Sequence, residues 1–279
     1  MEGGRPPTRR NAAPKSVSLT HAAIAITIRD MDAPTIEVLD SADLAERAAG
    51  FLQTISTRAV ATRGVAHVAL SGGSTPRALY RLLATPAWRD RIPWAHVHLW
   101  WVDERCVPPD DPESNYGVAF TLLLQHLPVT IVHRMHGEAE DPGEAARRYE
   151  QELRRQFGLQ GRARPRMDLI FLGMGADGHT ASLFPGTASL QEKRALVTVG
   201  RAPNPPHLRL TLTLPVLNRA ANVLFMVAGA NKGPALRKVL HPRPGTAPLP
   251  AAMVRPGRGR LTWLLDRAAA EAAGIPVSA

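Results

Sequence analysis

Short apolar runs alternate with stretches of helical periodicity along most of this sequence, and this alternation restricts the fold more than any other feature. Runs typical of buried strands occur at residues 36–39, 65–70, 96–102, 167–172, 208–214, 222–228 and 261–264. Helical stretches begin at Ser41, which is expected to cap the first of them, and at Thr75, Ser114, Asp141, Lys232 and Asp266. Repeated alternation of this kind is typical of a mostly parallel sheet with helices on both faces. We therefore predict a single α/β domain over residues 34–279.

The first 33 residues do not share this alternation. They contain Pro6, Pro7 and Pro14, scattered arginines and no sustained period. A segment of this composition cannot bury enough apolar surface to fold by itself. We expect residues 1–33 to form a disordered, basic and non-catalytic arm.

The composition excludes several classes of protein. Cys106 is the only cysteine, which rules out an intramolecular disulfide framework and a zinc site built on several thiolates. No stretch approaches the roughly 18 apolar residues of a membrane span, and residues 21–28 lack a following signal cleavage site, so we expect a cytoplasmic protein. The net charge of +10 suits anionic metabolites or nucleic acid, but aromatic residues are only 5% and no basic helix carries stacking rings. We expect no membrane and no nucleic-acid partner, and protein partners stay open.

The loop after the second apolar run has the composition of a phosphate site. In Rossmann-like sheets, ligands bind beyond the carboxyl ends of the strands. Here Gly72 and Gly73 allow a sharp turn and a close approach of backbone to ligand. Ser74 and Thr75 then present N–H groups and hydroxyls at the start of a helix, where the dipole favours an anion. The alternative is a tight strand-to-helix turn that binds nothing.

Two carboxylates and an arginine follow the next strand. Asp103, Glu104 and Arg105 are poor material for a core. The guanidinium of Arg105 can bind a phosphate through two parallel hydrogen bonds, and the alternative is a local ion pair. Cys106 has no histidine near it in sequence, and we expect an inert thiol.

The loop at residues 173–186 points to catalysis. Its glycines satisfy the G-x-G-x-x-G pattern of dinucleotide binding, but the segment continues into a Phe-Pro-Gly sequence instead of a long helix. His179 lies two residues from Asp177 in this glycine-rich loop. An imidazole is the side chain best suited to accept a proton from water near pH 7, and a carboxylate can orient it. The alternative is a surface histidine in a turn.

The remaining candidates give weaker signals. Lys232 begins a helix after an apolar run, where an amine is more often solvated than functional. The other histidines, including the pairs His96 and His98 and His133 and His136, have no carboxylate or thiol partners at metal-ligand spacing. We expect no metal and no cofactor.

Together these segments resemble the 6-phosphogluconolactonase family. The matching stretches are LSGGSTP, VDERxVP with SNY after it, GMGxDGHTASLFP, RLTLT and GxxK, in the expected order over about residues 35–272. The resemblance implies a metal-free hydrolase, without cofactor, that opens a phosphorylated sugar lactone in the pentose phosphate pathway. It also implies His179 as general base with support from Asp177. The phosphate-binding residues that it implies are Gly72, Gly73, Ser74, Thr75, Arg105, Arg209 and Lys232.

Two other functions stay open on this resemblance. Glucosamine-6-phosphate deaminases share the Gly-Gly loop and the Asp-Gly-His sequence, but typically have tyrosine where this chain has Arg105, and Ile-Ala-Phe-Asn where it has Thr-Ala-Ser-Leu. A sugar-phosphate sensor of the same fold would bind without turnover. Such proteins usually carry a helix-turn-helix, for which residues 1–33 are too short and irregular.

Overall fold

The described strands form two sheets, and all neighbours in the larger one run parallel. The computed structural model describes residue 1 and residues 34–128 and 131–277. The predicted arm lies outside these residues, so its disorder and its boundary at residue 33 stay predictions. The larger sheet has the order β1-β10-β9-β6-β2-β3-β5, and β4, β8 and β7 form a separate antiparallel sheet. The strands are β1 Thr35–Leu39, β2 Ala66–Leu70, β3 Val97–Trp101, β4 Asp103–Arg105, β5 Ile131–His133, β6 Leu169–Leu172, β7 Val197–Arg201, β8 Leu208–Leu212, β9 Asn222–Val227 and β10 Arg260–Asp266.

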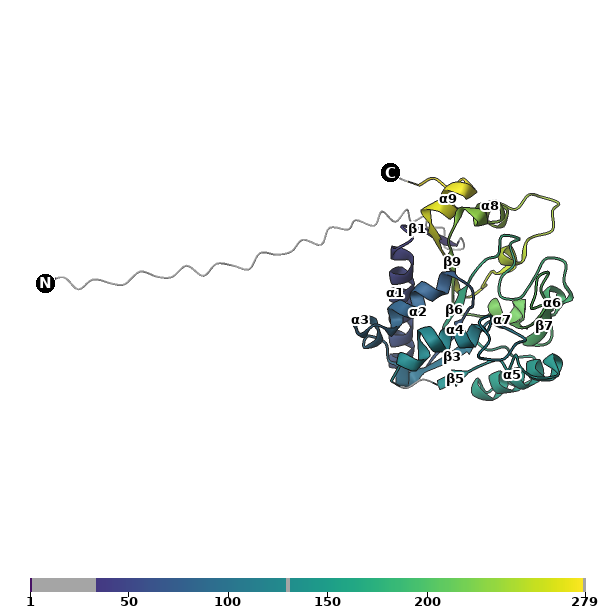
Figure 1. Ribbon diagram of the computed structural model, residues 1–279, viewed down its shortest axis with the longest axis horizontal. Coiled ribbons are helices and arrows are strands. Elements are labelled where there is room, and N and C mark those ends of the chain that lie inside the picture. Colours follow the sequence, from purple (N-terminus) through teal and green to yellow (C-terminus); the bar gives the residue numbers. More distant parts are fainter. Residues whose placement is uncertain (2–33, 129–130, 278–279) are drawn as a thin grey trace.

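Helices lie on both sides of the parallel sheet, as predicted. The helices are α1 Asp43–Arg63, α2 Thr75–Ala84, α3 Pro86–Arg89, α4 Asn115–Leu122, α5 Pro142–Gln156, α6 Ala188–Gln191, α7 Leu214–Leu217, α8 Gly233–Leu240 and α9 Arg267–Ala273. In Figure 1, α1 to α3 lie to the left of the sheet, and α5 and α6 lie to the right with β7. No helix among the described residues is long and apolar enough to cross a membrane.

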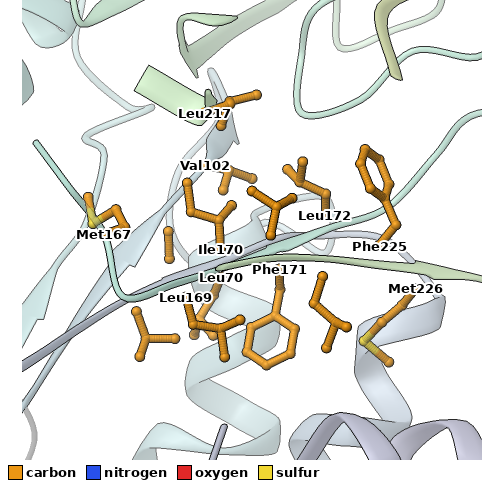
Figure 2. Close-up of a cluster of buried hydrophobic side chains, with 14 of the residues drawn as sticks. Leu70, Val102, Met167, Leu169, Ile170, Phe171, Leu172, Leu217, Phe225 and Met226 are labelled. Carbon is orange, nitrogen blue, oxygen red and sulfur yellow. The ribbon is translucent and has the colours of Figure 1, made fainter. Parts of the chain in front are cut away.

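The central strand β6 shows why the apolar runs become strands of the parallel sheet. All four of its residues are buried, and the leucine, isoleucine and phenylalanine side chains pack against Leu70, Val102 and Phe225 from neighbouring segments (Figure 2). A strand covered on both faces needs a continuous apolar run, and not an alternating one. The apolar run predicted at residues 167–172 meets this requirement, and its strand begins two residues later than expected.

The second, smaller sheet was not predicted. Its strand β8 was expected as a further member of the parallel sheet, but it pairs antiparallel with both β4 and β7. The strand β4 has only three residues, all charged, so it has no apolar pattern that could reveal it. This sheet continues from the carboxyl end of β3, because β4 begins two residues after that strand ends.

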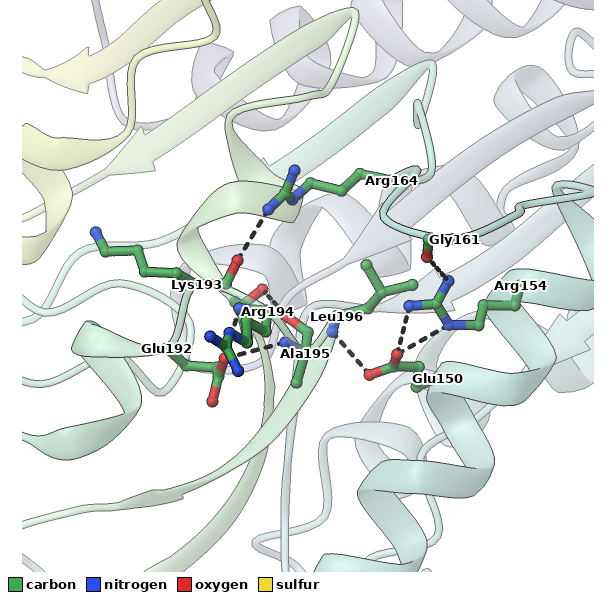
Figure 3. Close-up of polar contacts among 10 residues, drawn as sticks. Glu150, Arg154, Gly161, Arg164, Glu192, Lys193, Arg194, Ala195 and Leu196 are labelled. Carbon is green, nitrogen blue, oxygen red and sulfur yellow. Dashed lines mark hydrogen bonds and ion pairs between the residues drawn. The ribbon is translucent and has the colours of Figure 1, made fainter.

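The antiparallel sheet is attached to the rest of the molecule through α5. Glu150 accepts a hydrogen bond from the backbone N–H of Leu196 at 2.8 Å, just before β7, and pairs with Arg154 one helical turn away (Figure 3). Glu192 accepts from the N–H of Arg194 at 2.6 Å and so shapes the approach to the same strand. These contacts fix β7, and through it β8, beside the parallel sheet.

The prediction that Ser41 caps α1 was wrong. Ala42 occupies the N-cap position and makes no side-chain cap. The hydroxyl of Ser41 donates instead to Asp266, at the end of β10, at 3.2 Å. The long-range partner outweighs the local capping preference of serine.

Candidate active site

The strand order of the parallel sheet reverses between β2 and β6. From β2 the chain proceeds to β3 and β5 on one side, and from β6 to β9 and β10 on the other. The loops that follow β2 and β6 therefore lie next to each other at the carboxyl edge of the sheet. In open α/β sheets this reversal point is where ligands bind. It brings the Gly-Gly loop and the His179 loop to one place.

The loop after β2 leaves the start of α2 open to an anion. Ser74 is the N-cap residue of α2, but its hydroxyl makes no capping hydrogen bond, and Pro76 has no N–H. Gly73 has φ of +99°, a conformation that side-chain-bearing residues rarely adopt. Ser74 and Thr75 line a cavity of about 390 Å³, which Gly229 also borders. The arrangement can receive an anion at a positive helix end.

The loop after β6 holds His179 against Asp177. The ring Nδ1 lies 2.6 Å from Asp177 Oδ1, and the same oxygen accepts from the His179 backbone N–H at 3.1 Å. A Cβ on Gly175 would lie 2.1 Å from Nδ1, so only glycine leaves room for this pair. An ionised carboxylate can only accept, hence Nδ1 carries the proton and Nε2 has the free lone pair. No hydrogen bond from the described part of the chain reaches Nε2, and the side chain is 31% exposed.

The Asp177 carboxylate stays ionised in this setting. Burial acts to raise the pKa of Asp177, but the hydrogen bonds from the ring and backbone of His179 outweigh it and the net shift is downward. The ring of Phe184 lies 4.3 Å from the imidazole, centroid to centroid, and limits its movement. The histidine is therefore held between a charge and an aromatic ring.

Arg105 and Arg209 form a pair of like charges. They face each other in the register of β4 and β8. Arg209 is 8% exposed and its Nε has no hydrogen-bond partner among the described residues, while Arg105 donates from Nη1 to the carbonyl of Glu113 at 2.5 Å. Burial lowers the pKa of Arg209, and the charge of Arg105 lowers it further. Two guanidinium groups that face each other repel, and an anion bound between them would offset that repulsion.

The local ion pair that was the alternative to phosphate binding for Arg105 does not occur within the described chain. Glu104 instead caps α4, accepting from the backbone N–H groups of Asn115 and Tyr116, both at 2.7 Å. The hydroxyl of Ser114 and the N–H of Arg105 add two more donors. Burial raises the pKa of Glu104 to about 7 in spite of these donors.

The remaining sequence candidates are placed as follows. Lys232 lies half-buried in the turn Ala230–Lys232, which follows the Gly229 that borders the cavity beside Ser74 and Thr75. Burial raises the pKa of Cys106 to about 11, in keeping with an inert thiol. The described residues contain no cluster of three His, Cys, Asp or Glu side chains that could hold a metal.

Two residues that join these loops were missed by sequence reasoning. Asn115 and Ser182 are each 2% exposed, and both donate to Asp103. Asn115 was considered only as a helix start and as part of the SNY stretch, and Ser182 only as part of a motif. Both are polar residues followed by apolar ones, and this pattern is the sequence signal that could have indicated them.

The comparisons with known proteins agree with the fold and with the family resemblance of the sequence. A family model described as glucosamine-6-phosphate isomerases/6-phosphogluconolactonase matches residues 39–263. A 6-phosphogluconolactonase of Synechocystis sp. is 43% identical over 242 residues, which cover 86% of this chain and 98% of the relative. The solved 6-phosphogluconolactonase from Trypanosoma cruzi is 30% identical with a TM-score of 0.77, covering 86% of this chain and 97% of that one. A monomeric glucosamine-6-phosphate deaminase, 23% identical with a TM-score of 0.70 over 85% of this chain and 99% of that one, shares the fold.

Proposed function

Because the chain belongs to the family of glucosamine-6-phosphate isomerases and 6-phosphogluconolactonases and hydrolyses 6-phospho-D-glucono-1,5-lactone, we propose that His179 is the general base of this reaction. The reaction yields 6-phospho-D-gluconate and belongs to the oxidative pentose phosphate pathway. The observation that carries the proposal is the 2.6 Å contact between His179 Nδ1 and Asp177 Oδ1. It leaves Nε2 as the proton acceptor.

The reaction needs one proton to move twice. Nε2 of His179 accepts a proton from water while the water oxygen bonds to the lactone carbonyl carbon. The bond from that carbon to the ring oxygen then breaks, and the proton on Nε2 passes to the leaving oxygen. Asp177 holds the ring in the required tautomer and stabilises the transient imidazolium. A lactone is a reactive ester, so this scheme requires no covalent nucleophile.

The 6-phosphate is the group that the cationic residues would bind. Backbone N–H groups at Gly72, Gly73, Ser74 and Thr75 would meet it at the start of α2, where side-chain capping is absent. Arg105 and Arg209 would supply two guanidinium groups, and the buried Nε of Arg209 has no hydrogen-bond partner among the described residues. Lys232 would add charge from the turn after β9. The substrate class is therefore a phosphorylated sugar lactone, bound by its phosphate and attacked at its carbonyl.

One assay tests the reaction and its nearest competitor together. The purified protein is given 6-phospho-D-glucono-1,5-lactone, with acid release followed above spontaneous hydrolysis, and glucosamine 6-phosphate in parallel, with ammonia release followed. We expect turnover of the lactone alone. Ammonia release at a comparable rate would favour the deaminase, and binding without either product would favour a sensor.

A cytoplasmic location and the absence of a nucleic-acid partner stay predictions from sequence. Fractionation of cells that express the chain, and a gel-shift titration with duplex DNA and single-stranded RNA at 150 mM salt, would test them.

A further inference from the structure

Three buried polar residues connect the two loops of the proposed site. We propose that Asp103, Asn115 and Ser182 form a bridge that positions the Gly72 loop relative to the His179 loop and so sets the preference for phosphorylated over unphosphorylated lactones. The proposal rests on the roles proposed above for both loops. None of the three residues is assigned contact with the substrate, so they are positioning residues.

Asp103 is the centre of the bridge. It is 6% exposed, and its Oδ2 accepts from the Ser182 hydroxyl at 2.7 Å. Asn115 donates from Nδ2 to the Asp103 backbone carbonyl at 2.8 Å and to Oδ1 at 3.4 Å. Hydrogen bonds to a buried charged group are stronger than those between neutral groups, and losing one leaves an unpaired polar atom. Separating these three residues therefore costs free energy.

The Asn115 end lies directly on the phosphate-binding loop. A Cβ on Gly72 would lie 1.7 Å from Asn115 Oδ1, so the amide occupies the space that any other residue at position 72 would fill. That oxygen is buried without a hydrogen-bond partner in the described chain. Buried unpaired acceptors are rare in folded proteins, and an individual case needs a reason. Here the amide serves as a stop that fixes how near the Gly72 backbone comes to α4.

The Ser182 end fixes the segment that carries His179. The Ser182 N–H donates to Thr211 Oγ1 at 3.2 Å, and a Cβ on Gly200 would lie 2.6 Å from the Ser182 carbonyl oxygen. Between His179 and Ser182, Ala181 has φ of +48°, the one positive value at a non-glycine position in the described residues. Such a conformation persists only where the surroundings hold it. The Ser182 hydroxyl bond to Asp103 is one of the contacts that do so.

The two ends predict different kinetic effects. Removing the Ser182 hydroxyl loosens the general base, so Ser182→Ala should lower kcat about 10- to 100-fold and change KM less than about threefold. Removing the amide loosens the phosphate loop, so Asn115→Ala should raise KM for the phosphorylated lactone about tenfold or more. For unphosphorylated glucono-1,5-lactone, Asn115→Ala should change kcat/KM less than about threefold, whereas Ser182→Ala should lower it as much as for the natural substrate.

A paired substitution tests the contact between Asn115 and Gly72 directly. Gly72→Ala alone places a methyl group on the amide and should raise KM at least about tenfold. Adding Asn115→Ala vacates that space, and the double variant should bind phosphorylated lactone better than Gly72→Ala alone. Ser56→Ala is the matched control, because Ser56 is a fully buried serine of α1 that donates to the Leu52 carbonyl away from the site. It should leave both KM and kcat as in the wild type.

Protection by inorganic phosphate separates this proposal from the proposed site itself. Phosphate should raise the melting temperature of the wild type and of Ser182→Ala, and should raise that of Asn115→Ala less. If phosphate gives the wild type no protection and both lactones are hydrolysed equally well, the proposed phosphate site is wrong. If the wild type behaves as expected but Asn115→Ala loses as much on the unphosphorylated lactone as on the phosphorylated one, or the double variant is no better than Gly72→Ala, the bridge is overturned.

Discussion

The hydrogen bond between Asp177 and Nδ1 of His179 decides which nitrogen of the imidazole can react. A histidine without such a partner exchanges between two tautomers, each with a different basic nitrogen. The Gly175 backbone makes the contact possible by leaving out a side chain. In the proposed mechanism, the direction of proton transfer thus depends on three residues within five positions of the chain.

Removing the imidazole tests this arrangement. His179→Ala should lower kcat about 10²- to 10⁴-fold with little change in KM, since a positioned base acts mainly in the transition state. Asp177→Asn keeps an oxygen that can accept from Nδ1 and should cost less than His179→Ala. A larger cost for Asp177→Asn would identify another group as the base.

Replacing Arg105 by lysine tests the guanidinium pair. Lysine keeps the charge but loses the planar fork and the hydrogen bond to the Glu113 carbonyl. We expect kcat/KM for the phosphorylated lactone to fall at least about tenfold, equivalent to about 1.4 kcal/mol. The loss on glucono-1,5-lactone should be smaller, because that substrate gives the fork nothing to bind. Equal losses on both would make Arg105 a structural residue.

At the scale of elements, the sequence predicted six of the seven parallel strands, all but the three-residue β5, and the loops at their ends, because each depends on local signals. The run of apolar residues in β6 and the Thr75-Pro76 start of α2 are examples. The antiparallel sheet escaped prediction because β4 is three charged residues whose strand character comes entirely from pairing with β8. The contacts of Asn115 and Ser182 escaped for the same reason, since their partners lie 12 and 79 positions away.

Glycine is required at position 73 by the path of the loop into α2. Gly73 has φ of +99°, and a Cβ added at this position would lie in open space. The obstacle to a side chain is therefore backbone strain and not a clash. Gly73→Ala should shift the loop and raise KM for phosphorylated lactone about tenfold, with kcat less affected. Steady-state kinetics on both lactones would check this. A Gly73→Ala protein with the wild-type KM would place the phosphate elsewhere.

The burial of Glu104 beside α4 predicts a pH-dependent stability. The folded-state pKa of about 7 lies above the ordinary 4.5, so the folded protein binds this proton more tightly than the unfolded chain. The resulting stabilisation is full below about pH 4.5 and is lost as the pH rises through 7. The free energy of unfolding of the wild type, relative to Glu104→Gln, should fall by about 2–3 kcal/mol between pH 5 and pH 8 in urea titrations. A constant difference would mean that the four donors keep Glu104 ionised throughout.

At the scale of the whole molecule, the proposed mechanism places the chemistry in loops at one edge of the parallel sheet, and we expect it to need only water and the substrate. The described residues offer no set of three metal ligands, and a catalytic zinc typically has three from the protein. Exhaustive dialysis against EDTA should therefore leave kcat and KM unchanged. Activity that disappears on chelation and returns with added zinc would overturn this metal-free mechanism.

The pairing of β1 with β10 affects how the protein is made. Thr35 pairs with Thr262, so β1 emerges from the ribosome long before its partner strand exists. At about 5–20 residues per second, the wait is roughly 10–45 s. During that time β1 has no strand to join, and β9, once it has been made, presents an edge that can pair with another nascent chain until β10 joins it. Translation that stops before residue 260 leaves both in that state, so incomplete chains of this enzyme should be clients of chaperones and proteases rather than partly active fragments.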